Sequence, residues 1–255
     1  MFAIVAAAAL AGLAGCGGAS SSGNSGGGPA ATPATSAPSA SRSPQDVLGG
    51  ALTALRAGGA VHVTIATKIG SHSVDFSDDS GTNAGRQVIT ITGGEHATVL
   101  LVDGVGYAEG NEAALAGFFG FAPTEAATLA GRWISFHPGD TAGGTDYSAV
   151  VDGLTLASVG DELRLGGSLT LTGPAQAGGG AVVCVRGNPV AATGAPAGTK
   201  AALCVAASGQ PRPVSYRSSN SAGRQTISFS RWGEPLHLTA PPNPIAASSI
   251  GTGTA

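Results

Sequence analysis

The side chains that most often carry out chemistry are few in this sequence and lack the spacings of known catalytic or metal-binding motifs. No two histidines form a His-x-His or His-x₃-His pair, the short spacings that can bring two imidazoles together on one zinc ion. No Gly-x-Ser-x-Gly elbow joins an expected strand to a helix, as a serine nucleophile would need. We therefore expect no catalytic residue, no metal site and no cofactor, and we interpret all five histidines as polar strand or turn positions: His62, His72, His96, His137 and His237.

Three carboxylates lie close together before a glycine. Asp75, Asp78 and Asp79 precede Gly81, and clustered carboxylate oxygens are what calcium prefers. The alternating ligands and distal Glu of an EF-hand loop are absent, so we interpret the segment as a solvated hairpin turn. A hydrolase built from distant carboxylates stays open as a minor alternative, because such pairs meet only in space.

One cysteine ends the apolar run over residues 2–13. The four residues Leu13-Ala14-Gly15-Cys16 resemble the lipobox of bacterial lipoproteins, in which the cysteine is diacylated and becomes the first residue of the mature chain. The resemblance implies that residues 1–15 are a signal peptide. It also implies that a diacylglyceryl group on Cys16 anchors the protein to the extracytoplasmic face of the bacterial cell membrane. The apolar run itself is too short to span a bilayer, which takes about 20 helical residues.

With Cys16 assigned to lipid, Cys184 and Cys204 form an even pair in an oxidising compartment. Both lie in strand-like segments, residues 181–186 and 201–206, that are able to pair as neighbours. We expect a disulfide between them. The alternative is two buried free thiols that act as small apolar side chains.

The bulk composition limits the classes of partner. The chain has a net charge of −3 and only 11% charged residues, which indicates no basic field for nucleic acid and no polybasic patch for anionic lipid headgroups. Aromatic residues make up 5%, so the core must consist mainly of Val, Leu, Ile and Ala. Nucleic acid is therefore not an expected partner.

The order of expected elements predicts one α+β domain. Residues 16–43 contain mainly Gly, Ser, Ala, Thr and Pro and are expected to form a disordered tether. A helix capped by Ser43 begins at Pro44, and alternating apolar and polar residues then predict antiparallel strands. The segment from Thr98 to Val102 is apolar on both faces and should be a strand covered on both sides. Short helices are expected from Asn111 and Pro123, and residues 243–255 are expected to form a disordered tail after the domain at residues 44–242.

This layout resembles the actinobacterial lipoproteins of the LppX/LprG type, which are relatives of the LolA-like carriers. The resemblance rests on the lipobox and tether, on Gly131-Arg132-Trp133-Ile134 after the helical interruption, and on Gly209-Gln210-Pro211-Arg212-Pro213 before the last hairpin. It implies a curved antiparallel sheet, or half-barrel, wrapped around a few helices. It also implies an apolar cavity that accepts acyl chains.

The apolar residues around the helical interruption are the candidates to line such a cavity: Val99, Leu101, Leu115, Phe118, Phe119, Phe121 and Leu129. The expected function is non-catalytic binding or transport of a lipid or lipoglycan ligand. The same residues at the same spacings would also make an ordinary core. The alternative is therefore an interaction or structural lipoprotein with a filled core and an envelope protein as its partner.

Overall fold

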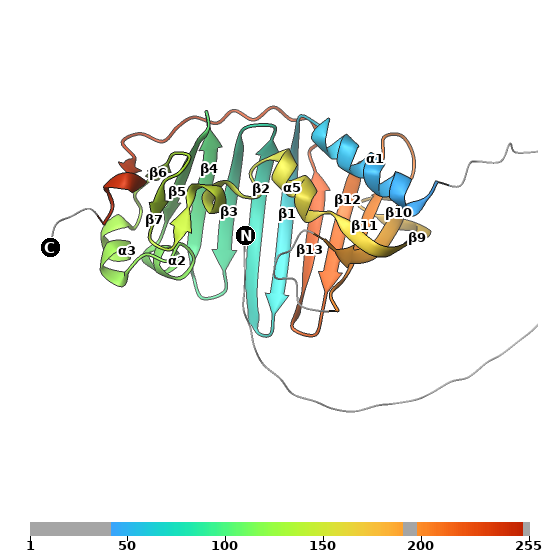
Figure 1. Cartoon of the computed structure of the whole chain (residues 1–255), viewed down its shortest axis with the longest axis horizontal. Helices are drawn as coiled ribbons and strands as arrows, with labels where there is room; N and C mark the ends of the chain where they lie inside the picture. The colour runs from blue at the N-terminus through green and yellow to red at the C-terminus, as the bar shows by residue number, and fades with distance from the viewer. Residues whose placement is uncertain (1–41, 191–197, 252–255) are drawn as a thin grey trace, which may run out of the picture.

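The computed structural model describes residues 42–190 and 198–251, which form one large sheet with helices packed on one face (Figure 1). The expected signal peptide, Cys16 and nearly all of the expected tether lie outside the described residues. None of the described helices combines the length and the apolar character needed to cross a membrane.

The first helix, α1 (Pro44–Arg56), begins where the sequence predicts. The Ser43 hydroxyl accepts a hydrogen bond from the Asp46 backbone N–H at 3.1 Å, and the Asp46 carboxylate accepts one from the Ser43 N–H at 3.2 Å. This capping box fixes the start of the helix because it pairs backbone donors that have no intrahelical partner. The buried face of α1 carries Val47, Leu48, Ala51 and Leu55.

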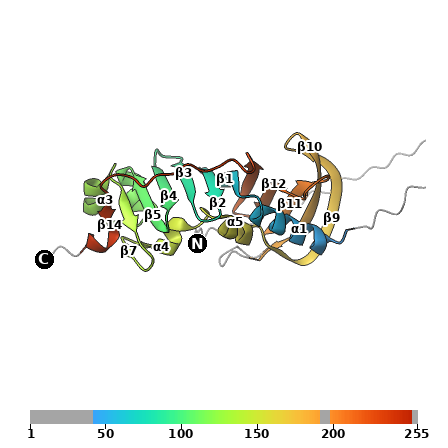
Figure 2. The same ribbon diagram turned by 90° about the horizontal axis from the view of Figure 1, so that it is seen from above.

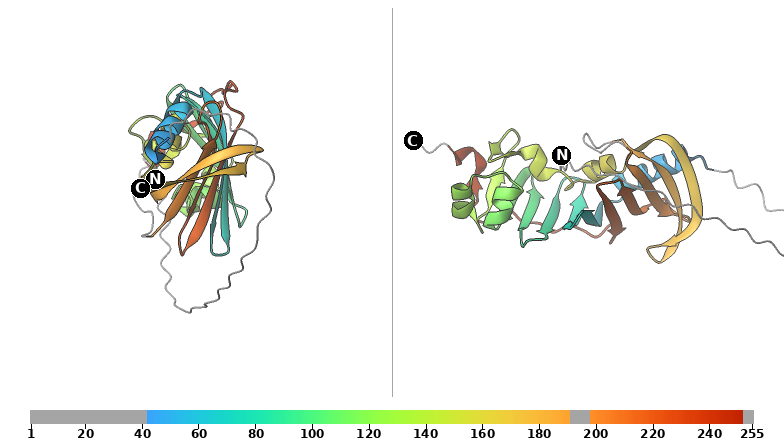
Figure 3. Two further views of the ribbon diagram at one scale, coloured as in Figure 1. Left: turned by 90° about the vertical axis from the view of Figure 1, so that its right-hand side faces the viewer. Right: turned by 90° about the horizontal axis from the view of Figure 1, so that it is seen from below.

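The main sheet has 12 strands in the order β14-β6-β5-β4-β3-β2-β1-β13-β12-β11-β10-β9, and every adjacent pair is antiparallel except β14 with β6. The expected fold class, α+β with a curved antiparallel sheet, is confirmed. Figures 2 and 3 show the sheet twisting along its length, with β9 and β10 curving round one end. The strands are β1 (Ala60–Ile69), β2 (His72–Gly81), β3 (Gly85–Ile91), β4 (His96–Val102), β5 (Val105–Gly110), β6 (Ile134–Phe136), β9 (Leu165–Ala177), β10 (Gly180–Pro189), β11 (Lys200–Ala206), β12 (Pro213–Ser219), β13 (Gly223–Ser230) and β14 (Ile245–Ala246).

We call the face that carries the helices the inner face and the opposite face the outer face. Besides α1, the helices are α2 (Glu112–Gly117), α3 (Pro123–Leu129), α4 (Tyr147–Val151) and α5 (Leu156–Glu162), and a small hairpin, β7 (Thr141–Ala142) and β8 (Thr145–Asp146), lies beside them. Side chains alternate between faces along each strand. On β1, Val61 and Val63 therefore point inward and His62 and Thr64 outward.

Two apolar clusters fill the inner face. The first cluster joins α1 and α5 to β1 and β9–β13, around Leu55, Leu163 and Leu203. The second cluster joins α2–α4 to β3–β6, around Leu115 and Phe136. Helices on the same face of the sheet contribute side chains to both clusters. The α4–α5 connection crosses this face between them.

Strand β4 is buried on both faces, as predicted. Val99 and Leu101 belong to the second cluster, whereas Leu100 and Val102 pack on the outer face with Tyr107 and with partly buried Leu238. The cover on the outer face is the segment after β13, which passes along the ends of the strands, at the top of Figure 1, towards β14. Residues 236–239 have no strand structure in this segment.

The expected disordered tail from residue 243 is wrong for residues 243–251. β14 pairs in parallel with β6 through Ile245 opposite Ile134, and a short 3₁₀ turn, Ala247–Ser249, follows. Ala247 is fully buried in the second cluster. The two prolines at 241 and 242 redirect the chain, and burial of apolar side chains beyond them orders the segment.

Candidate functional site

The structure brings the seven predicted cavity residues together in the second cluster. Phe118 is partly buried at its edge, and the other six side chains are each at most 6% exposed. The ring centroids of Phe118 and Phe119 lie 5.1 Å apart in an edge-to-face arrangement. The sequence therefore identified one contiguous apolar group, supplied by β4 and by the insert that contains α2 and α3.

The turn between α2 and α3 is held against the β7–β8 hairpin. The Gly144 N–H donates to the Phe119 carbonyl at 2.9 Å, and the Phe121 N–H donates to the Leu115 carbonyl at 3.1 Å. Gly120 has a φ of +73°, and a β-carbon there would lie 2.8 Å from the Cα of Gly144. Only glycine fits this close approach, so the insert forms a closed cover over the apolar cluster.

Two surface hollows lie elsewhere. One, of about 320 Å³, crosses the outer face of β13, β1, β2 and β3 and is lined mainly by small polar side chains such as Thr64, Ser77 and Thr226. The other, of about 210 Å³, lies between β1 and the segment after β13, beside His62 and Glu234. None of the seven predicted residues lines either hollow.

A buried carboxylic acid lies between the two apolar clusters on the inner face. Asp78 is 1% exposed, and among the described residues neither of its carboxylate oxygens has a hydrogen-bond partner. Burial raises the pKa of Asp78 to about 7, the nearby Gln87 amide opposes the rise, and the charge of Asp79 adds to it. Gln87 lies close enough to affect the pKa without making a hydrogen bond of normal geometry.

The cover over Asp78 is the connection between α4 and α5. The Ser80 hydroxyl donates to the Gly153 carbonyl at 2.9 Å, and residues 81 and 155 form a parallel bridge. Gly85 passes so close to this connection that a β-carbon there would lie 2.1 Å from the Leu154 carbonyl oxygen. Asp78 is therefore sealed beneath a backbone segment that packs directly on the sheet.

The expectation that Asp75, Asp78 and Asp79 form a solvated hairpin turn is wrong. All three lie within β2, and because side chains alternate, Asp78 points inward while Asp75 and Asp79 point outward. The carboxylates therefore do not converge on one ion. The sequence did contain a signal for this: Val74 and Phe76 predict an inward face, and continuing their period of two places residue 78 on it.

On the outer face Asp79 joins a small charged cluster. Its Oδ1 atom accepts a hydrogen bond from Arg231 Nη2 at 2.9 Å and lies 2.7 Å from His62 Nδ1. Arg231 Nη2 also contacts His62 Nδ1, and Arg231 Nη1 lies 3.8 Å from Glu234. His62 lies at a polar strand position, as predicted, but its partner Arg231 is far along the chain and leaves no local signal in the sequence.

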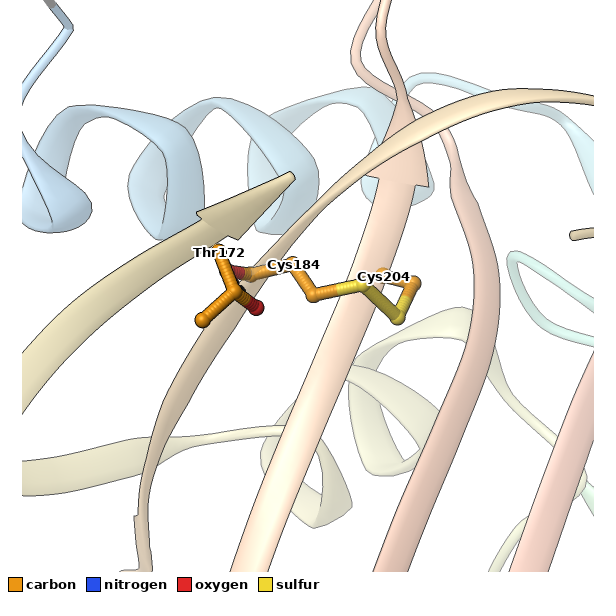
Figure 4. Close-up of a disulfide and its surroundings, with 3 residues drawn as sticks. All are labelled: Thr172, Cys184 and Cys204. Carbon is orange, nitrogen blue, oxygen red and sulfur yellow. Dashed lines mark hydrogen bonds between the residues drawn. A yellow bond between two sulfur atoms is a disulfide. The ribbon is translucent and has the colours of Figure 1, made fainter. Parts of the chain in front are cut away.

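The two remaining cysteines lie opposite each other on adjacent strands, Cys184 on β10 and Cys204 on β11. Their sulfur atoms are 2.07 Å apart, the length of a disulfide bond (Figure 4). Thr172 on β9 lies beside the pair, and its hydroxyl is 3.5 Å from the Cys184 carbonyl. The link therefore ties the two strands next to the curved end of the sheet.

No protein-family model matches the chain. No curated protein matches it in sequence. Solved structures do: the Mycobacterium tuberculosis lipoprotein LppX is 15% identical and aligns over 77% of this chain and 100% of its own, with a TM-score of 0.51. LprF from Mycobacterium bovis is 17% identical over 78% of this chain and 96% of its own, with a TM-score of 0.47. The chain therefore has the fold of LppX, and the resemblance found in the sequence is confirmed at the level of the fold.

Proposed function

We propose that this protein is a lipoprotein that is anchored through acylated Cys16 on the extracytoplasmic face of the cell membrane and binds a lipid or lipoglycan without catalysis. The ligand would lie between the sheet and the α2–α3 insert. The observation that carries the proposal is the convergence of the seven apolar residues under this insert. Burial of acyl chains there would stabilise the complex by about 0.8 kcal/mol per methylene, so no charged contact is needed.

Ligand entry requires the insert to move. The turn between α2 and α3 is held to the β7–β8 hairpin by one backbone hydrogen bond, from Gly144 to Phe119. The short helices themselves span Glu112–Gly117 and Pro123–Leu129, and short helices have little stability of their own. Outward displacement of this insert would open the apolar cluster while leaving the ladder of β3, β4 and β5 intact.

The alternative is an envelope interaction or structural lipoprotein whose core is filled. The observation that favours it is the burial of Leu115, Phe119 and Phe121, which are each at most 3% exposed in the closed arrangement. In that case the second cluster would only stabilise the fold. An exposed surface, not the core, would then contact an envelope protein.

Native mass spectrometry of the full chain, extracted in detergent from the membranes of an actinobacterial host and freed of the micelle in the gas phase, distinguishes the lipid-binding function from the structural one. An added mass that organic extraction removes supports lipid binding and identifies the ligand class. A mass equal to that of the acylated chain alone, with no uptake from host lipid extract, would refute it.

A matched pair of variants tests whether the added mass is bound beneath the insert. Phe119→Ala removes a ring from the second cluster, whereas Phe229→Ala removes one from the first cluster. Both variants should lower stability by about 3–5 kcal/mol. Only Phe119→Ala should reduce ligand retention; equal retention in both would mean that the ligand lies elsewhere.

A further inference from the structure

Basic and acidic residues are segregated along this chain. No Asp or Glu occurs between Glu162 and Glu234, although this stretch contains Arg164, Arg186, Lys200, Arg212, Arg217, Arg224 and Arg231. Strands β9–β13 all fall within it. The net charge of −3 is therefore the sum of a basic stretch and an acidic remainder.

The register of the sheet gathers five cations on the outer face. Lys68 on β1 lies directly opposite Arg224 on β13. Ser219 on β12 pairs with Arg224 on one side and Lys200 of β11 on the other. Two residues along the strands, residue 202 of β11 pairs with residue 217 of β12 and residue 186 of β10. We call the resulting group the basic patch: Lys68, Arg186, Lys200, Arg217 and Arg224.

The basic patch is compact. It extends across five neighbouring strands, and strands lie about 4.8 Å apart, so it is about 19 Å wide. Its two rows are two residues apart along the strands, about 7 Å. All five side chains are exposed. Small residues such as Ala66 and Ser219 surround them, so the charged groups project beyond the neighbouring side chains.

The described residues offer these cations no acidic partner. Lys200 donates to the Asn188 side chain at 3.1 Å, and every ion pair found in the described part of the chain involves other groups. The first acidic side chain on the same face is Asp75, on β2 beyond the edge of the patch. Like charges held together without counter-charges weaken folding, which indicates that the patch has an external anionic partner.

We propose that the basic patch docks the domain on the anionic surface of the lipid bilayer. This choice of occupant rests on the proposed anchor: the expected tether, residues 16–43, would reach on the order of 30 Å as a flexible coil and would keep the domain near the membrane. The described outer face of β10–β13 and β1 has no Phe, Tyr or Trp side chain on which bases of a nucleic acid would stack. The expectation from net charge that the chain has no polybasic patch is wrong, because the strand register gathers five cations on this face.

Vesicle sedimentation of the mature chain, residues 16–255 carrying Cys16→Ser, tests the proposal without the acyl anchor and without the apolar signal peptide. The vesicles are phosphatidylcholine alone or phosphatidylcholine with about one third phosphatidylglycerol. Each basic residue near an anionic surface strengthens binding about fivefold, so Arg217→Ala with Arg224→Ala should weaken binding to the anionic vesicles about 25-fold. High salt should abolish it.

The control replaces two exposed arginines outside the patch, Arg56→Ala with Arg132→Ala, and should change binding less than twofold. Equal effects of the two double variants, equal binding to both vesicle types, or capture of soluble polyphosphate with no vesicle binding would each overturn the proposal. Because the assay uses no ligand from the apolar cluster, its failure leaves the mass measurement of lipid retention unaffected.

Discussion

Asp78 lies opposite Gln87 across the β2–β3 ladder, on the inner face of the sheet, and neither of its carboxylate oxygens has a hydrogen-bond partner among the described residues. An ionised carboxylate in this position is costly, because it has left water without gaining donors in exchange. The protonated acid avoids most of this cost, which is why the pKa rises to about 7. The strip between the two apolar clusters is therefore sensitive to pH.

Stability should fall as the pH rises from about 4 to 7. The folded state binds the Asp78 proton more tightly than the unfolded chain, so unfolding releases a proton in this range and the free energy of unfolding decreases. A pKa raised from 3.8 to about 7 corresponds to a loss on the order of 4 kcal/mol, complete above pH 7. Urea unfolding at pH values between 4 and 8 measures this decline.

Asp78→Asn should flatten the decline and make the protein more stable than wild type at pH 8. The amide cannot ionise, and its volume is nearly that of the acid. Asp75→Asn, on the exposed outer face of the same strand, is the matched control and should keep the decline, because Asp78 is intact. A wild-type profile that is flat from pH 4 to 7 would show that Asp78 ionises in the folded state as readily as in the unfolded chain.

Gly85→Ala should detach the α4–α5 connection from the sheet. The added β-carbon would lie 2.1 Å from the Leu154 carbonyl oxygen, so the backbone must move, and we expect a loss of at least about 3 kcal/mol of stability. Gly49→Ala in α1, where no atom lies within 4 Å of the new carbon, should instead stabilise by up to about 1 kcal/mol. Chemical denaturation compares the two, and similar losses in both would contradict the packing described.

The segment after the two prolines should contribute to stability. Ala247→Asp places a charge where the side chain is fully buried and should cost at least about 3 kcal/mol. Ser248→Asp, at an exposed neighbouring position, should change stability by less than about 0.5 kcal/mol. If thermal unfolding shows the same midpoint for both variants, residues 243–251 do not pack on the sheet in solution.

Local patterns predicted most elements of the fold. Ser43 and Pro44 predicted the start of α1, and the alternation around Val61 and Val63 predicted β1, because caps and periodicity act within a few residues. The helix α5 was not predicted, although Leu156 and Val159 carry its buried face; it has only two turns. β14 was also missed, since a two-residue strand that pairs with Ile134 has no local signature.

The functional surfaces, like the elements of the fold, could be predicted only where the signal is local in the sequence. The apolar cluster could be predicted because the insert with Phe119 and Phe121 is the most apolar stretch after the expected signal peptide. The basic patch could not, because Lys68 and Arg224 are separated by most of the domain and meet only through the register of β1 with β13. The segregation of basic and acidic residues along the chain was visible in the sequence. Which basic side chains share one face depends on the strand pairing, which only the fold supplies.

Reduction should destabilise the domain at the curved end of the sheet. The two cysteines are separated by 20 residues in sequence, and closing a loop of that length stabilises the folded state by about 3 kcal/mol in the chain-entropy model. Dithiothreitol should therefore lower the urea midpoint of the wild type, and it should have no effect on Cys184→Ala with Cys204→Ala. The Cys16→Ser variant should respond to dithiothreitol as the wild type does, because the proposed acylation site takes no part in the loop. An unchanged midpoint in the wild type would mean that the β10–β11 ladder alone holds this end of the sheet together.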